Sequence, residues 1–198
     1  MTEHVTNQKQ AEELCAKGIE LLRLGKFAEA AVCCNSAIEI NPRFDLAWVT
    51  KGHAIERLGR HEEAIDCCDK ALEINPRLIP AWLTKRLALQ HLGKHSEALA
   101  CCNKTLEINP KDADTWCLRG NALRELGKFG ESIHSYDKAL EINPRSAAAW
   151  YNKGKTLGAL GKIEGAITCY NKALEINPRH DAARRGLMVA NSRHHTGA

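Results

Sequence analysis

The sequence predicts an all-α fold, a solenoid built from antiparallel helical hairpins. Three observations predict it. The tetrapeptide INPR, written INPK in one copy, recurs with a strict period of 34 residues, at 40–43, 74–77, 108–111, 142–145 and 176–179. Each interval holds two short segments with apolar residues at helical spacing, and a glycine lies between the two segments. A fixed period of this length is the signature of a repeat array.

The period divides the chain into five repeats and two terminal segments. The repeats are 11–44, 45–78, 79–112, 113–146 and 147–180, preceded by an N-terminal extension at 1–10 and followed by residues 181–198. A terminal unit of an array needs a polar outer face. We therefore expect a capping helix from 181 to about 191 and a frayed tail, SRHHTGA. In the capping helix, Arg184 occupies the position that tryptophan has in the repeats.

Each helix of the repeat has a start and a stop that the sequence specifies. In the first helix (helix A), Trp48, Gly52 and Ile55 lie at i, i+4 and i+7, on one face. Helix A ends at a Leu-Gly-Lys or Leu-Gly-Arg sequence, where glycine supplies the left-handed turn. The second helix (helix B) ends at Asn-Pro, because proline cannot continue the hydrogen-bond ladder.

These residues resemble the tetratricopeptide repeat (TPR) family, in the form of prokaryotic arrays with WxxKG and ALEINP signatures. The matching places are the early aromatic (Trp48, Trp82, Trp116, Trp150), the small residue of helix A (Gly18, Gly52, Gly120, Gly154), the alanine of helix B (Ala30, Ala64, Ala98, Ala166) and the prolines that follow it. The resemblance covers the five repeats. It implies a right-handed solenoid with helix A on a concave groove that binds a peptide or helix.

One repeat departs from this pattern at a place where space is short. Arg86 replaces the helix-A glycine of the third repeat. Glycine allows helix A and helix B to approach closely, so we expect Arg86 either to extend outward to solvent or to loosen its hairpin.

Composition and charge exclude several classes of protein. The chain is 44% hydrophobic and 26% charged, which is typical of a folded protein. Its net charge of +4 is too small to indicate a nucleic-acid partner. No apolar stretch is long enough for a signal peptide or a membrane span, so we expect no membrane partner and a cytoplasmic location.

The nine cysteines include three doublets, Cys33-Cys34, Cys67-Cys68 and Cys101-Cys102. The second cysteine of each doublet aligns with Tyr136 and Tyr170 of later repeats, which is a packing place of helix B. Adjacent helical residues point about 100° apart, so a doublet cannot chelate a metal. We therefore expect core packing. A metal or thiol function that draws cysteines from adjacent repeats is kept as a remote alternative.

No motif for catalysis or a cofactor is present in the sequence. Residues 154–156 read GKT, but Ala149 stands where a phosphate-binding loop needs its first glycine. His61 is followed by Glu-Glu-Ala-Ile, so the zinc motif HExxH is missing. We predict a non-enzymatic protein without cofactor or metal.

The resemblance implies that certain positions of helix A point into the groove. We assign the partner contacts to these positions. A Lys/Asn clamp for a C-terminal carboxylate is not complete at these places. The predicted contact residues are Val49, His53, Leu83, Leu87, His91, Cys117, Asn121, Arg124, Tyr151 and Lys155. The sequence thus predicts a protein or peptide partner, and self-assembly into a homo-oligomer is the alternative because near-identical repeats can stack.

Overall fold

The structure of the protein, a computed structural model, describes the backbone of residues 2–196 and the side chains of residues 7–194. Helices account for all regular secondary structure in this range. They are α1 (Thr2–Arg23), α2 (Phe27–Ile40), α3 (Asp45–Arg57), α4 (His61–Ile74), α5 (Ile79–His91), α6 (His95–Ile108), α7 (Ala113–Glu125), α8 (Phe129–Ile142), α9 (Ala147–Ala159), α10 (Ile163–Ile176) and α11 (Asp181–Thr196). None of these helices, over the described residues, combines the length and the apolar character that a membrane span requires.

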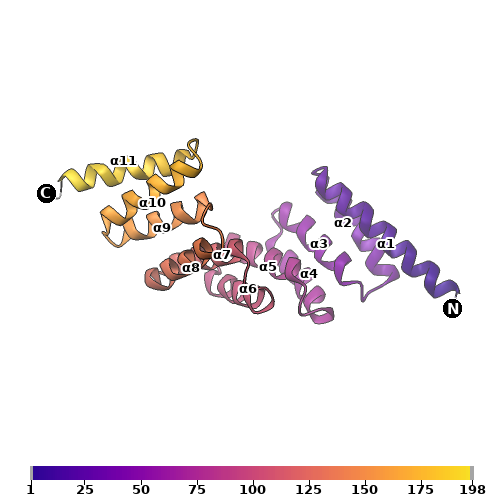
Figure 1. Ribbon diagram of the computed structural model, residues 1–198. Coiled ribbons are helices and arrows are strands. Elements are labelled where there is room, and N and C mark those ends of the chain that lie inside the picture. Colours follow the sequence, from indigo (N-terminus) through magenta and orange to yellow (C-terminus); the bar gives the residue numbers. More distant parts are fainter. Residues whose placement is uncertain (1, 197–198) are drawn as a thin grey trace. The chain divides into compact units, whose positions relative to one another are not determined.

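The chain divides into two compact units, and each consists of consecutive helical hairpins (Figure 1). Unit 1 ends at Ile108 and contains α1 to α6; unit 2 begins at Asn109 and contains α7 to α11. From α3 onward, each helix A begins 34 residues after the previous one, so the predicted all-α hairpin repeat is confirmed. The odd-numbered helices are helix A of each hairpin, and the even-numbered helices are helix B.

Helical structure extends into both terminal segments. Helix α1 begins at Thr2, so the N-terminal extension continues the first helix A without a break. Helix α11 runs to Thr196, beyond the predicted end at about residue 191. Residues 197–198 of the predicted tail lie outside the described residues.

The INPR tetrapeptide joins one hairpin to the next through two hydrogen bonds. The Asn75 side chain accepts a hydrogen bond from the backbone N–H of Arg77 at 3.2 Å, which closes the turn after α4. The carbonyl oxygen of Pro76 accepts one from the indole N–H of Trp82 at 2.9 Å. Trp48, Trp116 and Trp150 make the same bond to the proline six residues earlier. The tetrapeptide therefore stops helix B and also anchors the next helix A.

The predicted glycine turns are confirmed by the backbone. The glycine that separates the two helices of a hairpin has φ between 71° and 80° in every repeat, at Gly25, Gly59, Gly93, Gly127 and Gly161. Side chains are disfavoured in this left-handed region, because the Cβ atom approaches the backbone.

Within a hairpin, the small residue of helix A packs against the helix-B position that holds Tyr136 in the fourth repeat and Tyr170 in the fifth. A Cβ atom added at Gly120 would lie 2.5 Å from Cε1 of Tyr136, whose ring is completely buried. At Gly52, the nearest atoms are Cβ of Cys67 and Sγ of Cys68, both at 3.2 Å. Cysteine at the tyrosine position therefore leaves slightly more room beside Gly52, although Sγ of Cys34 would lie 2.6 Å from a Cβ atom added at Gly18.

Of the two alternatives expected for Arg86, extension of its side chain to solvent is wrong. The residue is only 9% exposed, and its guanidinium donates to Oε1 of Gln90 at 2.6 Å. Burial lowers the pKa of this guanidinium, while Cys102, Cys101 and the Glu56 carboxylate oppose that shift. The long side chain fits because the facing residue of helix B is a cysteine and not a tyrosine.

Candidate functional site

The first helices of neighbouring repeats contact one another in both units. In unit 1, α3 contacts both α1 and α5; in unit 2, α9 contacts both α7 and α11. Each unit therefore presents a continuous helix-A face. The predicted contact residues divide between the two faces, with Val49, His53, Leu83, Leu87 and His91 in unit 1 and Cys117, Asn121, Arg124, Tyr151 and Lys155 in unit 2.

On the helix-A face of unit 1, the five residues differ in accessibility. Leu83 and Leu87 lie one helical turn apart on α5 and are half-buried, while His53 and His91 are exposed. Val49 is only 4% exposed and packs against Ala71, Leu72 and Ala81. The prediction of Val49 as a partner contact is therefore corrected, because its side chain fills the core between α3, α4 and α5.

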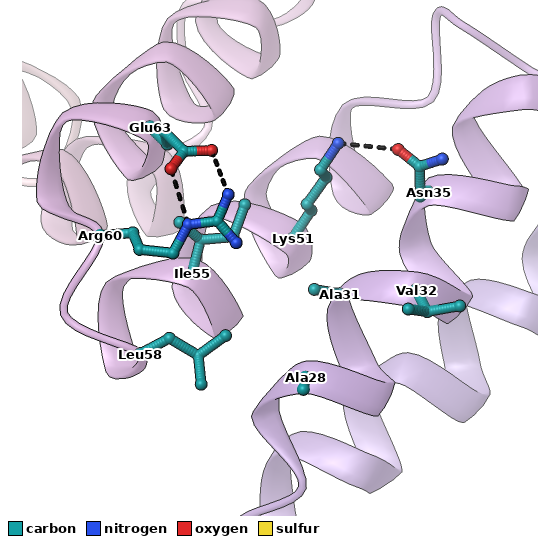
Figure 2. Close-up of a pocket in the computed structure, with 9 residues that line it drawn as sticks. All are labelled: Ala28, Ala31, Val32, Asn35, Lys51, Ile55, Leu58, Arg60 and Glu63. Atoms are coloured by element: carbon teal, nitrogen blue, oxygen red, sulfur yellow. Dashed lines mark hydrogen bonds and ion pairs between the residues drawn. The ribbon is translucent and has the colours of Figure 1, made fainter.

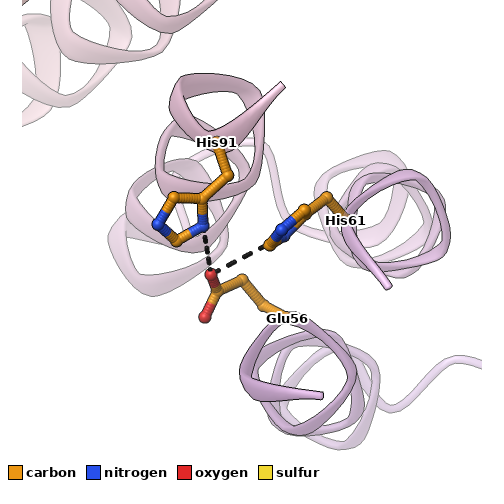
Figure 3. Close-up of side chains that lie close together, drawn as sticks. All are labelled: Glu56, His61 and His91. Carbon is orange, nitrogen blue, oxygen red and sulfur yellow. Dashed lines mark ion pairs between the residues drawn. The ribbon is translucent and has the colours of Figure 1, made fainter. Parts of the chain in front are cut away.

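Unit 1 also brings together three side chains that the sequence keeps apart. Glu56 comes from the last turn of α3, His61 is the first residue of α4, and His91 is the last residue of α5 (Figure 3). Nδ1 of His91 lies 2.9 Å from Oε1 of Glu56, and Nδ1 of His61 lies 3.8 Å from the same oxygen. Sequence reasoning missed this cluster, since spacings of 5 and 30 residues match no linear motif.

On unit 2, Cys117 is another correction. It is 8% exposed and packs with Tyr136, Ala139 and Ala149, so it belongs to the core and not to a partner surface. Its burial raises the pKa of its thiol, and the amide of Asn152, 3.7 Å from Sγ, opposes that shift. Asn121 is half-buried and accepts a hydrogen bond from the Tyr136 hydroxyl at 2.8 Å.

The remaining residues of the unit 2 face are an aromatic group and two cations. The ring of Tyr151 lies 4.9 Å from that of His180 and 6.0 Å from that of Tyr170, measured between centroids. The Arg124 side chain is only 15% exposed and pairs with Glu125 at 2.8 Å, so it offers little surface to a partner. Lys155 is exposed and lines a hollow of about 170 Å³ whose floor contains Tyr170, Ala166 and Ala190.

A second hollow lies on unit 1 between α2, α3 and α4, away from the predicted contacts (Figure 2). Its volume is about 410 Å³. Apolar side chains including Val32, Ile55 and Leu58 line it, and its rim carries the Lys51–Asn35 hydrogen bond and the Arg60–Glu63 ion pair. Nothing in the repeat pattern predicted this hollow, because its shape depends on small residues of α2.

The second cysteine of each doublet lies in a hairpin core. Cys34, Cys68 and Cys102 are completely buried, which confirms the prediction of core packing. Burial raises the pKa of the Cys101 thiol to about 11 and also raises that of Cys67. Thiols that remain protonated and buried are poor ligands and poor nucleophiles at neutral pH.

The hairpin geometry, the glycine turns and the helix-A faces define a helical-hairpin repeat protein. Family profiles described as tetratricopeptide repeat match residues 11–44, 46–78, 79–112, 101–134 and 147–180, and a profile described as TPR repeat matches residues 120–161. The chain belongs to the tetratricopeptide repeat family. A comparison with curated proteins finds no match.

Solved structures of TPR proteins share the fold at low sequence identity. YrrB, described as a TPR protein with an unusual peptide-binding site, has a TM-score of 0.77 and 23% identity over 93% of this chain and 95% of its own. MamA from Desulfovibrio magneticus RS-1 has a TM-score of 0.80 and 20% identity over 87% of this chain and 97% of its own. The TPR protein TTC0263 from Thermus thermophilus has a TM-score of 0.67 and 20% identity over 91% of this chain and 98% of its own.

Proposed function

We propose that this protein is a non-enzymatic interaction scaffold whose helix-A face on unit 1 binds an apolar peptide segment or a partner helix. The observation that supports this most strongly is the pair Leu83 and Leu87. Both are half-buried on α5 and lie one helical turn apart, so they form an apolar pair on the helix-A face that an apolar partner side chain can contact. A few buried residues at the centre of an interface provide most of its binding free energy.

The helix-A face of unit 2 supplies a different chemistry. Tyr151 is a half-buried aromatic ring held against His180, and Lys155 adds an exposed positive charge nearby on α9. A partner segment with an apolar residue and an acidic group would complement these two side chains. Asn121 and Arg124 are engaged by Tyr136 and Glu125, so we assign them a supporting role.

Selection of peptides from a displayed random library against the purified protein tests the proposal. We expect enriched sequences with apolar residues, and saturable binding of a selected peptide measured by fluorescence anisotropy. Leu87→Ser should weaken that binding by about tenfold or more, the equivalent of losing one buried anchor. Absence of any saturable ligand, or equal affinity in the variant, contradicts the proposal.

Self-association is the second candidate, because apolar side chains are exposed on the last helix. Met188 and Val189 of α11 are exposed, so the predicted polar outer face of the cap is interrupted at these two residues. Light scattering across a range of concentrations tests this candidate. An oligomer that dissociates in Met188→Glu would support it, while a monomer at all concentrations excludes it.

A further inference from the structure

We propose that Glu56, His61 and His91 form a binding site for a zinc-class divalent metal ion. One ligand atom from each residue lies within 4.8 Å of the other two, and the three residues come from three successive helices of unit 1 (Figure 3). The proposal concerns unit 1 alone and does not depend on the proposed partner-binding function.

The donor atoms are those that zinc selects. Two imidazole nitrogens and one carboxylate oxygen are a three-ligand set that binds zinc and leaves a coordination position for water or an incoming group. His91 is 47% exposed at its side chain, which gives an ion a route from solvent. The rings of His61 and His91 are 4.6 Å apart between centroids, so both imidazoles already face one region of space.

The buried carboxylate is incompletely satisfied without a cation. The side chain of Glu56 is 2% exposed, and its Oε2 atom has no hydrogen-bond partner. Nδ1 of His61, which points towards this carboxylate, also has none. Buried polar atoms without partners are uncommon and costly, and a bound ion is one of their standard explanations.

Comparison between repeats shows that packing does not require these residue types. The places of Glu56 and His61 are occupied by Leu22 and Phe27 one repeat earlier, and the place of His91 by Arg57. There the Arg57 guanidinium lies 4.6 Å from the centre of the Phe27 ring. Two apolar residues and an arginine at one hairpin junction are thus replaced by three metal-ligating groups at the next.

The buried Arg86 guanidinium is the main opposing feature. Its positive charge interacts with Glu56, so it competes with a bound dication for the carboxylate. The side chain of Gln90, the residue before His91 on α5, accepts a hydrogen bond from this guanidinium at 2.6 Å. The site is therefore expected to bind zinc with moderate affinity and not as a structural zinc centre that the fold requires.

Cobalt(II) and zinc(II) titrations of the full chain, freed of metal and kept reduced with a non-thiol phosphine, test the proposal. We expect one equivalent of cobalt to bind with visible ligand-field absorption and without the near-ultraviolet band of thiolate ligation. Added zinc should displace the bound cobalt and abolish this absorption. A separate titration of zinc in competition with a chromophoric chelator gives its affinity. Glu56→Gln and His91→Ala should each weaken zinc binding by at least about tenfold.

His95→Ala is the matched control, because His95 occupies the position of His61 in the next repeat, where Gln90 occupies the position of Glu56. It should bind zinc as the wild type does. His91 lies at an exposed helix end, so its variant keeps the fold, and circular dichroism checks this for both variants. The proposal is overturned if no saturable binding occurs, if Glu56→Gln and His91→Ala bind as the wild type does, or if the cobalt spectrum shows thiolate ligation.

Discussion

Arg184 donates a hydrogen bond from its guanidinium to the carbonyl oxygen of Pro178 at 2.7 Å. The indole of Trp150 makes the equivalent bond to Pro144 at 3.0 Å. Arg184 looked like a simple departure from the repeat in the sequence, yet it preserves the hydrogen bond that anchors a helix A to the preceding turn. It does not replace the ring, which in Trp150 packs against the cores on both sides of α9.

This difference predicts unequal costs for two alanine substitutions. Trp150→Ala removes a large packed ring and should lower the free energy of unfolding by about 3 kcal/mol. Arg184→Ala removes two hydrogen bonds of an exposed side chain, to the Pro178 carbonyl and to Asp181, and should cost about 1 kcal/mol. Urea denaturation followed by circular dichroism measures both values. Equal decreases in the free energy of unfolding would show that packing of the Trp150 ring does not stabilise the protein.

The residue that faces the helix-A glycine should determine how that glycine tolerates a methyl group. Gly120→Ala places Cβ against the buried ring of Tyr136, and the resulting overpacking should destabilise the protein by about 1–3 kcal/mol. Gly52→Ala meets cysteine atoms at 3.2 Å, and the higher helix propensity of alanine, worth about 1 kcal/mol, should offset most of that cost. Thermal denaturation of the pair measures the contrast, and the reverse order would contradict the packing described.

Thiol accessibility follows from burial. Cys33 is half-buried, and the other eight cysteines are buried. An aromatic disulfide reagent at neutral pH should therefore modify one thiol per chain rapidly and the others only as the protein opens. Cys33→Ser should abolish the rapid phase. Rapid modification of several thiols in the native protein would contradict the packing of the doublets.

Stability should fall at alkaline pH, because burial raises the pKa of several thiols, to about 11 for Cys101. A thiol whose pKa is higher in the folded state stabilises the fold fully below its unfolded pKa, about 8.5. That contribution is lost as the pH rises towards the folded value. Urea midpoints should therefore decrease between about pH 8 and about pH 10, with a smaller decrease in Cys101→Ala. An identical decrease in the variant would exclude this thiol as a cause.

The sequence predicted the repeats and the hairpins well, because each boundary depends on local chemistry. Asn75 and Pro76 end a helix, and Gly59 closes a turn, whatever lies elsewhere in the chain. Periodicity also placed Cys68 in the core, since it shares a place with Tyr136. Such conclusions need only the spacing of residues along the chain.

The candidate sites were harder to predict, because they depend on how side chains meet across helices. The repeat pattern placed Val49 on the groove, but neighbouring helices cover it. It assigned His91 to the groove and did not bring Glu56 and His61 next to it. The sequence did hold one indication of this cluster. Glu56 is an ionisable residue at a repeat position where the first repeat has the apolar Leu22.

The helix-A face of unit 1 is the central functional claim, and the hollow around Val32 is its rival on the same unit. The two surfaces lie on different helices, since Leu83 and Leu87 belong to α5 and Val32 to α2. Substitutions on one surface therefore leave the other intact. Serine at these positions removes apolar contact area and adds no charge.

The affinity of one selected peptide for Leu83→Ser/Leu87→Ser and for Val32→Ser, relative to the wild type, tests this claim most directly. We predict a loss of more than about tenfold in the double variant and no change in Val32→Ser, as expected for apolar anchors on α5. A loss in Val32→Ser together with wild-type affinity in the double variant would contradict the claim and assign binding to the hollow between α2, α3 and α4.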